Sequence, residues 1–174
     1  MTIAEERTST GQLSELEQAL FDHLKQRLTG LNLSELGPLD AVADRMVASL
    51  PRTDSVWKDI AGPVYTSRGL QKWLGISRQA ISQHAKERRI LRLITADGIS
   101  VFPAFQFDDH GHRLPHLKDV LDILYEGLDD PWTWATWLNT PIRNGESYAD
   151  RLRQGEWESV LEQAREDAWA WSRP

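Results

Sequence analysis

The chain has 174 residues, of which 40% are hydrophobic and 26% charged, with no cysteine and a formal net charge of −6. A chain of this size can form one ordinary domain or two small ones, and it is too apolar for disorder to be expected. The absence of cysteine excludes disulfides, thiolate zinc sites and a cysteine nucleophile. No run of about 18 apolar residues predicts a membrane span.

The charge is distributed unevenly along the sequence. Residues 61–95 contain seven Lys or Arg and one acid, a local charge of +6, whereas residues 1–60 carry −4 and residues 96–174 carry −8. A basic block of this kind attracts polyanions to one face of a protein. We therefore expect DNA to bind the central segment, while the acidic remainder suits a basic protein partner.

Two amphipathic helices are predicted at the N-terminus. Leucines recur every three or four residues over 12–29, and a second apolar face predicts a helix over Pro38–Leu50. The segment Arg52–Pro63 is predicted to be a connector, with Trp57 and Ile60 as core anchors. These helices could pack on the central segment or pair between two chains, and the sequence leaves both possibilities open.

The centre of the chain predicts a helix-turn-helix. A first helix is expected over Ser67–Leu74 and a second over Arg78–Arg89, with Ser77 as the cap of the second. Gly75 would supply the left-handed backbone that the turn requires. Thr66 is the cap expected for the first helix. The apolar residues expected on the inner faces are Leu70, Leu74, Ile76 and Ile81.

A β-hairpin is predicted directly after this motif. Asp97-Gly98 lies between the two apolar runs Leu91–Thr95 and Ile99–Phe102, which is a strong hairpin signal, and Pro103 is expected to end the second strand. Helix, turn, helix and hairpin together form a winged arrangement.

The second helix of such a motif enters the major groove of DNA with its N-terminal side chains at the base edges. Arginine can bind guanine, and glutamine adenine, with two hydrogen bonds each, while later basic residues contact phosphates. The predicted DNA contacts are Ser77, Arg78, Gln79, Ser82, Gln83, Lys86, Arg88, Arg89 and Arg92.

The C-terminal part is predicted to be helical. One helix is expected from Pro115 to near Gly127, with Leu117, Val120, Leu121, Leu124 and Leu128 on its apolar face. Shorter helices follow at Pro131 and over Tyr148–Arg153, and the last covers about Glu156–Trp171, with Val160, Leu161, Ala164 and Ala168 directed inward.

Six of the eight tryptophans lie in the last 43 residues. Core filling in a small domain accounts for Trp134, Trp137 and Trp157. Trp169 and Trp171 lie so near the end of the chain that either core packing or insertion into a partner's pocket is possible.

Several strings in this half resemble antitoxins of the Xre/MbcA/ParS type. They follow the helix-turn-helix in the order Val101-Phe102-Pro103-Ala104-Phe105-Gln106-Phe107, Leu114-Pro115, Trp137-Leu138-Asn139-Thr140-Pro141, Gly145, Leu152-Arg153-Gln154-Gly155-Glu156 and Val160-Leu161. The resemblance covers roughly residues 64–165. It implies an antitoxin that binds a toxin with a RES domain, an enzyme that consumes NAD, and that represses its own promoter. The partner contacts that it implies are Leu152, Trp157, Val160, Trp169, Trp171 and Arg173.

Catalysis is not expected. The cluster of Asp108, Asp109, His110, His112 and His116 lacks the spacing of a helical metal site and is interpreted as a solvated turn. The sequence contains no Gly-rich phosphate loop and no Gly-x-Ser-x-Gly string. No cofactor is therefore predicted.

The fold class predicted is mainly α: N-terminal helices over residues 1–60, a winged helix-turn-helix over 61–113 and a helical partner-binding domain over 114–174. The function expected is that of a cytoplasmic, homodimeric antitoxin that binds double-stranded operator DNA and a toxin. Two alternatives remain open. One is a stand-alone regulator whose C-terminal domain serves dimerisation or ligand sensing; the other is a protein-binding inhibitor with an idle helix-turn-helix.

Overall fold

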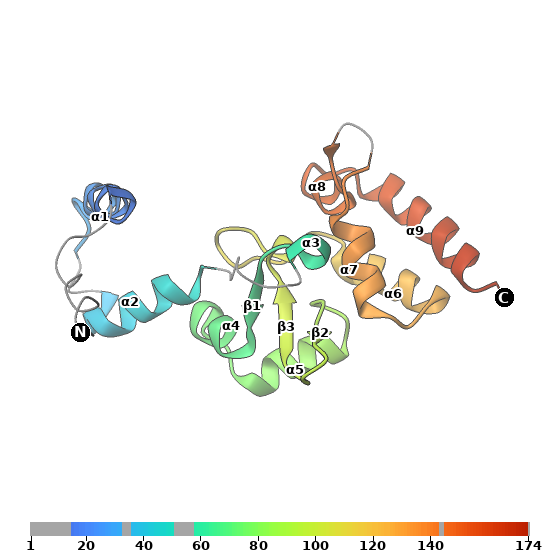
Figure 1. The fold of residues 1–174 in the computed structure, drawn as a ribbon, viewed down its shortest axis with the longest axis horizontal. Coiled ribbons are helices and arrows are strands. Elements are labelled where there is room, and N and C mark those ends of the chain that lie inside the picture. Colours follow the sequence, from blue (N-terminus) through green and yellow to red (C-terminus); the bar gives the residue numbers. More distant parts are fainter. Residues whose placement is uncertain (1–14, 33–35, 51–57, 143–144, 174) are drawn as a thin grey trace, which may run out of the picture. The chain divides into compact units, whose positions relative to one another are not determined.

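A computed structural model describes residues 15–32, 36–50, 58–142 and 145–173 of the chain (Figure 1). The predicted anchor Trp57 lies outside these residues. The fold is mainly helical with a small antiparallel sheet, which confirms the predicted fold class. None of the described helices is long and apolar enough to cross a membrane.

The chain divides into two compact units, residues 1–42 and residues 43–174. This division does not follow the boundaries predicted at residues 60 and 113. The first unit contains α1 (Glu15–Leu28), and α2 (Leu39–Ala48) runs across the division. Both helices agree with the two amphipathic helices predicted over residues 12–29 and Pro38–Leu50.

The second unit begins with a short helix, α3 (Lys58–Ala61), in the segment that was predicted to be a connector. Ala61 is buried, whereas Ile60 is 37% exposed, so the prediction of Ile60 as a core anchor is wrong. A small residue fits at this point because α3 packs closely on a later helix, α7 (Pro131–Asn139).

A three-stranded antiparallel sheet follows, in the order β1-β3-β2. The hairpin predicted around Asp97-Gly98 is confirmed as β2 (Leu93–Ile94) and β3 (Ser100–Pro103). The third strand, β1 (Val64–Thr66), was not predicted. Pro103 is the last residue of β3 and pairs with Val64, at the end of the ladder where a missing N–H is tolerated.

The C-terminal helices are α6 (Leu117–Gly127), α7, α8 (Tyr148–Arg153) and α9 (Trp157–Trp171). The helix expected from Pro115 begins two residues later, because His116 adopts a left-handed backbone with φ 57°. Leu128 is 40% exposed, so its predicted place on the inner face of α6 is wrong: it follows the helix as its extended C-cap. The four residues predicted inward on α9 are all buried.

Two hydrophobic clusters hold the second unit together. The smaller joins β1 and β3 to α4 (Ser67–Leu74) and α5 (Arg78–Lys86); its buried members are Tyr65, Leu70, Ile81, Ile90, Phe102 and Phe107. The larger combines sheet residues such as Val64 and Leu93 with α6, α7, α8 and α9. The winged segment and the C-terminal helices therefore share a core, which fixes the helix-turn-helix on the helical part.

Candidate nucleic-acid interface

The helix-turn-helix forms from local signals in the sequence. Thr66 Oγ1 accepts a hydrogen bond from the backbone N–H of Gly69 at 3.1 Å and caps α4. Gly75 takes the left-handed conformation, φ 67° and ψ 26°, at which a side chain would be strained. Ser77 Oγ then accepts from the N–H of Ala80 at 3.1 Å and caps α5. The predicted caps and turn are confirmed, and α4 has the predicted bounds.

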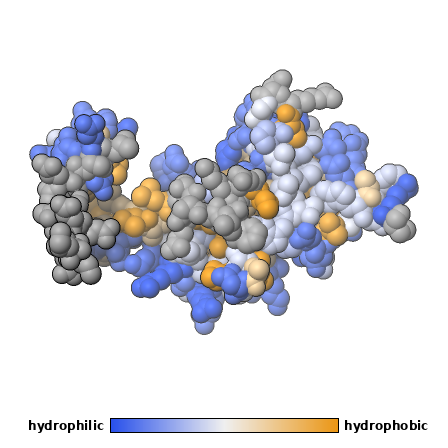
Figure 2. Space-filling view, viewed as in Figure 1, coloured by the Kyte–Doolittle hydropathy of each residue, from blue (hydrophilic) through white to orange (hydrophobic). Residues whose placement is uncertain are grey.

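The helix α5 buries one side and exposes the other. Ile81 is 3% exposed and packs in the smaller cluster, with Leu70 fully buried opposite it. The predicted base-contact residues face away from this core. The exposed base-contact candidates are Ser77, Arg78, Gln79, Ser82 and Gln83, and the predicted phosphate contact Lys86 is exposed as well. In Figure 2 the lower edge of the molecule, where α4 and α5 lie in Figure 1, is mainly hydrophilic.

Among the described residues, Arg78 and Lys86 have no acidic partner within ion-pair distance. Their charges are therefore available to a polyanion. Gln83 differs, because its side-chain amide donates to Glu87, and this hydrogen bond holds the pKa of Glu87 below its usual value. Gln83 must release Glu87 before it can bind a base with both amide groups.

The cations that follow the helix are arranged differently from the prediction. The helix ends at Lys86, three residues before the predicted end, and Arg88 has a left-handed backbone with φ 53°. Arg88 Nε donates to Asp122 Oδ1 on α6 at 2.6 Å. Because Asp122 already pairs with this guanidinium, the predicted phosphate contact of Arg88 is disfavoured. Arg89 is paired with Glu87 at 2.8 Å, and Arg92 is half-buried.

The hairpin carries no positive charge. No Lys or Arg occurs in residues 93–103, and Asp97 lies at its tip, where its carboxylate accepts from the hydroxyl of Thr95. Ile94 and Ile99 are 54% and 52% exposed on either side of this turn. A hairpin with an acidic tip is unsuited to phosphate contacts, so it does not extend the basic surface of α4 and α5.

Two further groups beside α5 were not predicted as parts of the site. His84 on α5 has a buried Nδ1 for which the described residues provide no hydrogen-bond partner. Burial lowers its pKa, and the positive charges of Arg113 and Arg89 lower it further. Arg113, from the loop before α6, thus adds to the positive charge near α5, and only the tertiary fold brings it there.

The predicted partner contacts fall into two groups. Leu152 and Val160 are 1% and 0% exposed, so they are core residues and cannot contact a partner unless the helices separate. Trp157 is 37% exposed and stacks on His116, with ring centroids 4.6 Å apart, so it does not fill the core as expected.

The two tryptophans near the C-terminus have different environments. Trp169 is 59% exposed, and the guanidinium carbon of Arg173 lies 3.3 Å from its ring centroid. Trp171 instead is half-buried and packs against the larger core cluster. Core packing therefore explains Trp171, whereas Trp169 and Arg173 form an exposed aromatic and cationic end of α9.

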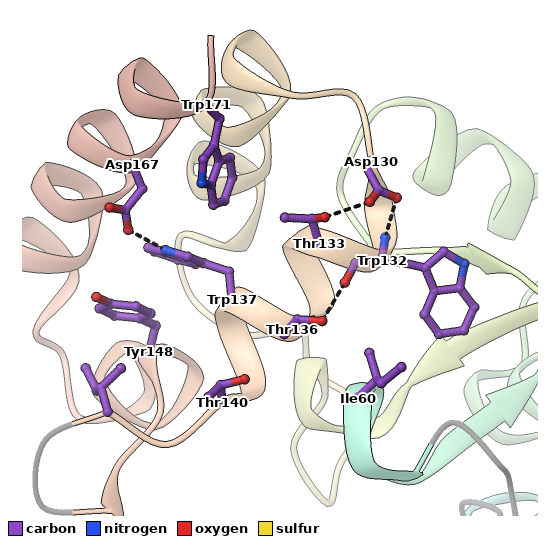
Figure 3. A pocket seen from close by; sticks show the side chains of 11 residues that line it. Ile60, Asp130, Trp132, Thr133, Thr136, Trp137, Thr140, Tyr148, Asp167 and Trp171 are labelled. Atoms are coloured by element: carbon purple, nitrogen blue, oxygen red, sulfur yellow. Dashed lines mark hydrogen bonds between the residues drawn. The ribbon is translucent and has the colours of Figure 1, made fainter. Parts of the chain in front are cut away.

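A groove of about 530 Å³ lies along α7 (Figure 3). Three tryptophans, a tyrosine and two isoleucines from α3 to α9 contribute to its walls, and threonines one turn apart on α7 line it. Trp137 stacks on Tyr148 with ring centroids 4.0 Å apart, and the Nε1 of Trp137 donates a hydrogen bond to Asp167 Oδ2 at 2.7 Å. A largely aromatic groove with a few fixed polar groups is the usual form of a small-molecule site.

The loop with the predicted solvated turn is organised around one carboxylate. Asp108 Oδ1 accepts from the backbone N–H groups of His110 and His112, and its Oδ2 lies 2.9 Å from His112 Nδ1. Within the described ranges, no three His, Asp or Glu side chains are close enough together to hold a metal ion.

Helix, turn, helix and hairpin on a shared core with a helical C-terminal part define a winged helix-turn-helix arrangement. No family model and no curated protein sequence matches the chain. Its fold is similar to the NMR structure of Rv2175c, with a TM-score of 0.56 and 22% sequence identity over 69% of this chain and 90% of that chain. The likeness concerns the fold, and the resemblance to Xre/MbcA/ParS antitoxins stays a prediction.

Proposed function

We propose that this protein is a DNA-binding transcription regulator that reads duplex DNA with α5. The observation that carries the proposal is the solvent-facing side of α5, where Arg78, Gln79 and Ser82 are exposed on a helix whose opposite side is buried. Arginine and glutamine at the start of a recognition helix can make paired hydrogen bonds to guanine and adenine in the major groove.

The charges of this surface support the same proposal. Arg78 and Lys86 on α5 lack acidic partners among the described residues, and Arg68 is exposed on α4. The acids of the chain lie mainly outside residues 61–95. A polyanion approaching this face therefore meets a positive potential, which favours fast association and a strong dependence on salt. Regulation of this kind would take place in the cytoplasm.

The test is selection of binding sites from a library of duplexes with a random central segment, followed by fluorescence anisotropy on the selected duplex. We expect Arg78→Ala with Gln79→Ala to abolish discrimination between selected and scrambled duplexes. Lys86→Ala should weaken binding to both equally and reduce the slope of log K against log salt by about 1. Arg165→Ala, an exposed cation on α9, is the matched control and should change neither.

Two results would overturn the proposal: selection that enriches no sequence, or sequence-specific binding that survives in the double variant. The first would favour the protein-binding inhibitor with an idle helix-turn-helix. The second would place DNA recognition on another surface.

Toxin neutralisation is a second candidate function, and the exposed end of α9 favours it. Trp169 is 59% exposed, and Arg173 lies over its ring. Together they offer an aromatic and cationic anchor for a protein partner. The partner proposed is a RES-domain toxin encoded by a neighbouring reading frame. Growth rescue on co-expression tests the proposal, and toxicity without rescue, or a harmless neighbour, would exclude it for that partner.

The variant for this assay follows from the packing of α9. Truncation after Glu166 would also remove Ala168 and Trp171, which are part of the fold. Trp169→Ala with Arg173→Ala removes only exposed side chains. We expect this variant to lose rescue and to keep DNA binding, and Glu162→Ala on the exposed side of α9 is the control.

Ligand sensing by a stand-alone regulator is supported by the groove along α7. Its walls join α3, which directly precedes the sheet, to the C-terminal helices. A ligand bound there would contact both α3 and the C-terminal helices. A screen of aromatic small molecules by thermal shift, with Trp132→Ala as the groove variant, tests this alternative; a compound that stabilises both forms equally does not bind in the groove.

A further inference from the structure

The helix α1 presents apolar side chains to solvent. Leu20 and Phe21 are 55% and 54% exposed, and Leu24 and Leu28 are half-buried. Residues three, four and seven positions apart share one side of a helix, so these four side chains form a single stripe. A helix of 14 residues is only marginally stable alone in water. Burial of the stripe against another surface would stabilise it.

The charges of α1 indicate which partner could cover its apolar stripe. Glu15 and Glu17 lie in the first turn, and Lys25 and Arg27 lie in the last turn. This order suits the dipole of each helix, and it also discriminates between partner orientations. A parallel pair of such helices would set acid against acid and base against base, whereas an antiparallel pair brings opposite charges together at both ends.

We propose that α1 pairs with α1 of a second copy of this chain, in the antiparallel orientation. A two-fold axis makes every contact occur twice. With Leu20 of one copy opposite Leu24 of the other, Glu17 is opposite Arg27. One register thus pairs Leu20 with Leu24 and places acidic turns against basic turns.

This inference rests on α1 and is independent of DNA binding. If both hold, the dimer carries two recognition helices and binds two half-sites related by the same axis. Loss of self-association would leave binding to a single half-site intact, and loss of DNA binding would leave the dimer intact. The two proposals can therefore fail separately.

Sedimentation velocity of the full chain over a range of concentrations is the first test. An interface of one helix from each copy is small, so we expect association on the order of micromolar concentrations or above. The mass should rise from 19.9 kDa toward twice that value. Leu20→Ser with Leu24→Ser should stay monomeric, and Gln26→Ser, on the opposite side of α1, should behave like the wild type. A wild-type chain that remains monomeric at all concentrations overturns the proposal.

A charge-exchange experiment separates pairing from an effect on folding. Lys25→Glu with Arg27→Glu makes both ends of α1 acidic, and Glu15→Lys with Glu17→Lys makes both ends basic. Each variant alone should be monomeric because like charges meet, and an equimolar mixture should form heterodimers that high salt weakens. Variants that fail to associate when mixed, or that each dimerise as well as the wild type, contradict the charge pairing.

The orientation can be measured directly because the chain has no cysteine. A Glu17→Cys chain mixed with an Arg27→Cys chain should form a mixed disulfide under mild oxidation, and each chain alone should cross-link poorly. Efficient cross-linking of each chain with itself would show a parallel pair and overturn the antiparallel register.

Discussion

Arg88 and Asp122 join the end of α5 to α6, with Arg88 Nε donating to Asp122 Oδ1 at 2.6 Å. The guanidinium carbon of Arg88 also lies 4.3 Å from the ring centroid of Tyr125 on the same helix. Burial tends to raise the pKa of Asp122, but hydrogen bonds from Lys118 and Arg88 outweigh it and keep this pKa below its usual value. These contacts hold Arg88 in a left-handed backbone, φ 53°, that disfavours any residue with a side chain.

The opposing side-chain and backbone effects at Arg88 can be separated by two substitutions. Arg88→Ala loses the ion pair and the ring contact and keeps the strain, so we expect it to be less stable than the wild type by about 1 kcal/mol. Arg88→Gly loses the same contacts but relieves the backbone, and it should be more stable than Arg88→Ala by about 1 kcal/mol. Urea unfolding measures both. Equal stability of the two variants would show that the left-handed backbone carries no strain.

His84→Leu is expected to stabilise the protein. The buried Nδ1 of His84 lacks a partner among the described residues, and an apolar side chain of similar size removes the cost of burying it, about 1 kcal/mol. Burial, Arg113 and Arg89 lower the pKa of His84 below the ordinary value of 6.5, so the unfolded chain binds a proton more readily than the folded one.

The sign of the pH dependence at His84 follows from linkage. The wild type should lose stability as the pH falls through 6.5, where the unfolded chain takes up the proton. The leucine variant has no such group, so its advantage should grow as the pH is lowered. Urea unfolding at several pH values measures this, with His110→Leu on the exposed loop as control. An advantage that shrinks toward low pH would contradict the lowered pKa.

The sequence predicted those parts of the site that depend on near neighbours. The caps Thr66 and Ser77 and the turn at Gly75 act over three or four residues, so their signals are complete in the sequence. The strand β1 was missed because three residues form a strand only by pairing with β3, almost 40 positions later.

Tertiary contacts decided the remaining differences. The direction of Arg88 depends on Asp122 in another helix, and no local signal reports it. The groove along α7 is assembled from helices that are separate in the sequence. Leu152 and Val160 were named as partner contacts from resemblance, and the packing of α8 and α9 places them in the core instead.

Gly127→Ala is expected to disrupt the packing of α6 on α9. A Cβ at this position would clash with the carbonyl oxygen and the Cα of Ala168, and backbone atoms cannot move aside cheaply. Overpacking of this kind typically costs about 1–3 kcal/mol or more. Gly155→Ala is the matched control, because no atom lies within 4 Å of its Cβ and only its positive φ opposes the change. Thermal unfolding compares them, and an equal loss in both would show that α6 and α9 can separate freely.

Ser77 caps α5, and we also propose it as a DNA contact; two substitutions distinguish these roles. Ser77→Ala removes the oxygen that accepts from the N–H of Ala80, so α5 loses its cap and stability should fall by about 1 kcal/mol. Ser77→Asp keeps an acceptor at the cap and should preserve stability. Its negative charge, however, lies at the end of α5 that would face the DNA, so it should weaken binding much more than Ser77→Ala does. Unfolding and anisotropy on the selected duplex measure the two effects; an aspartate variant that binds DNA like the wild type would remove the start of α5 from the interface.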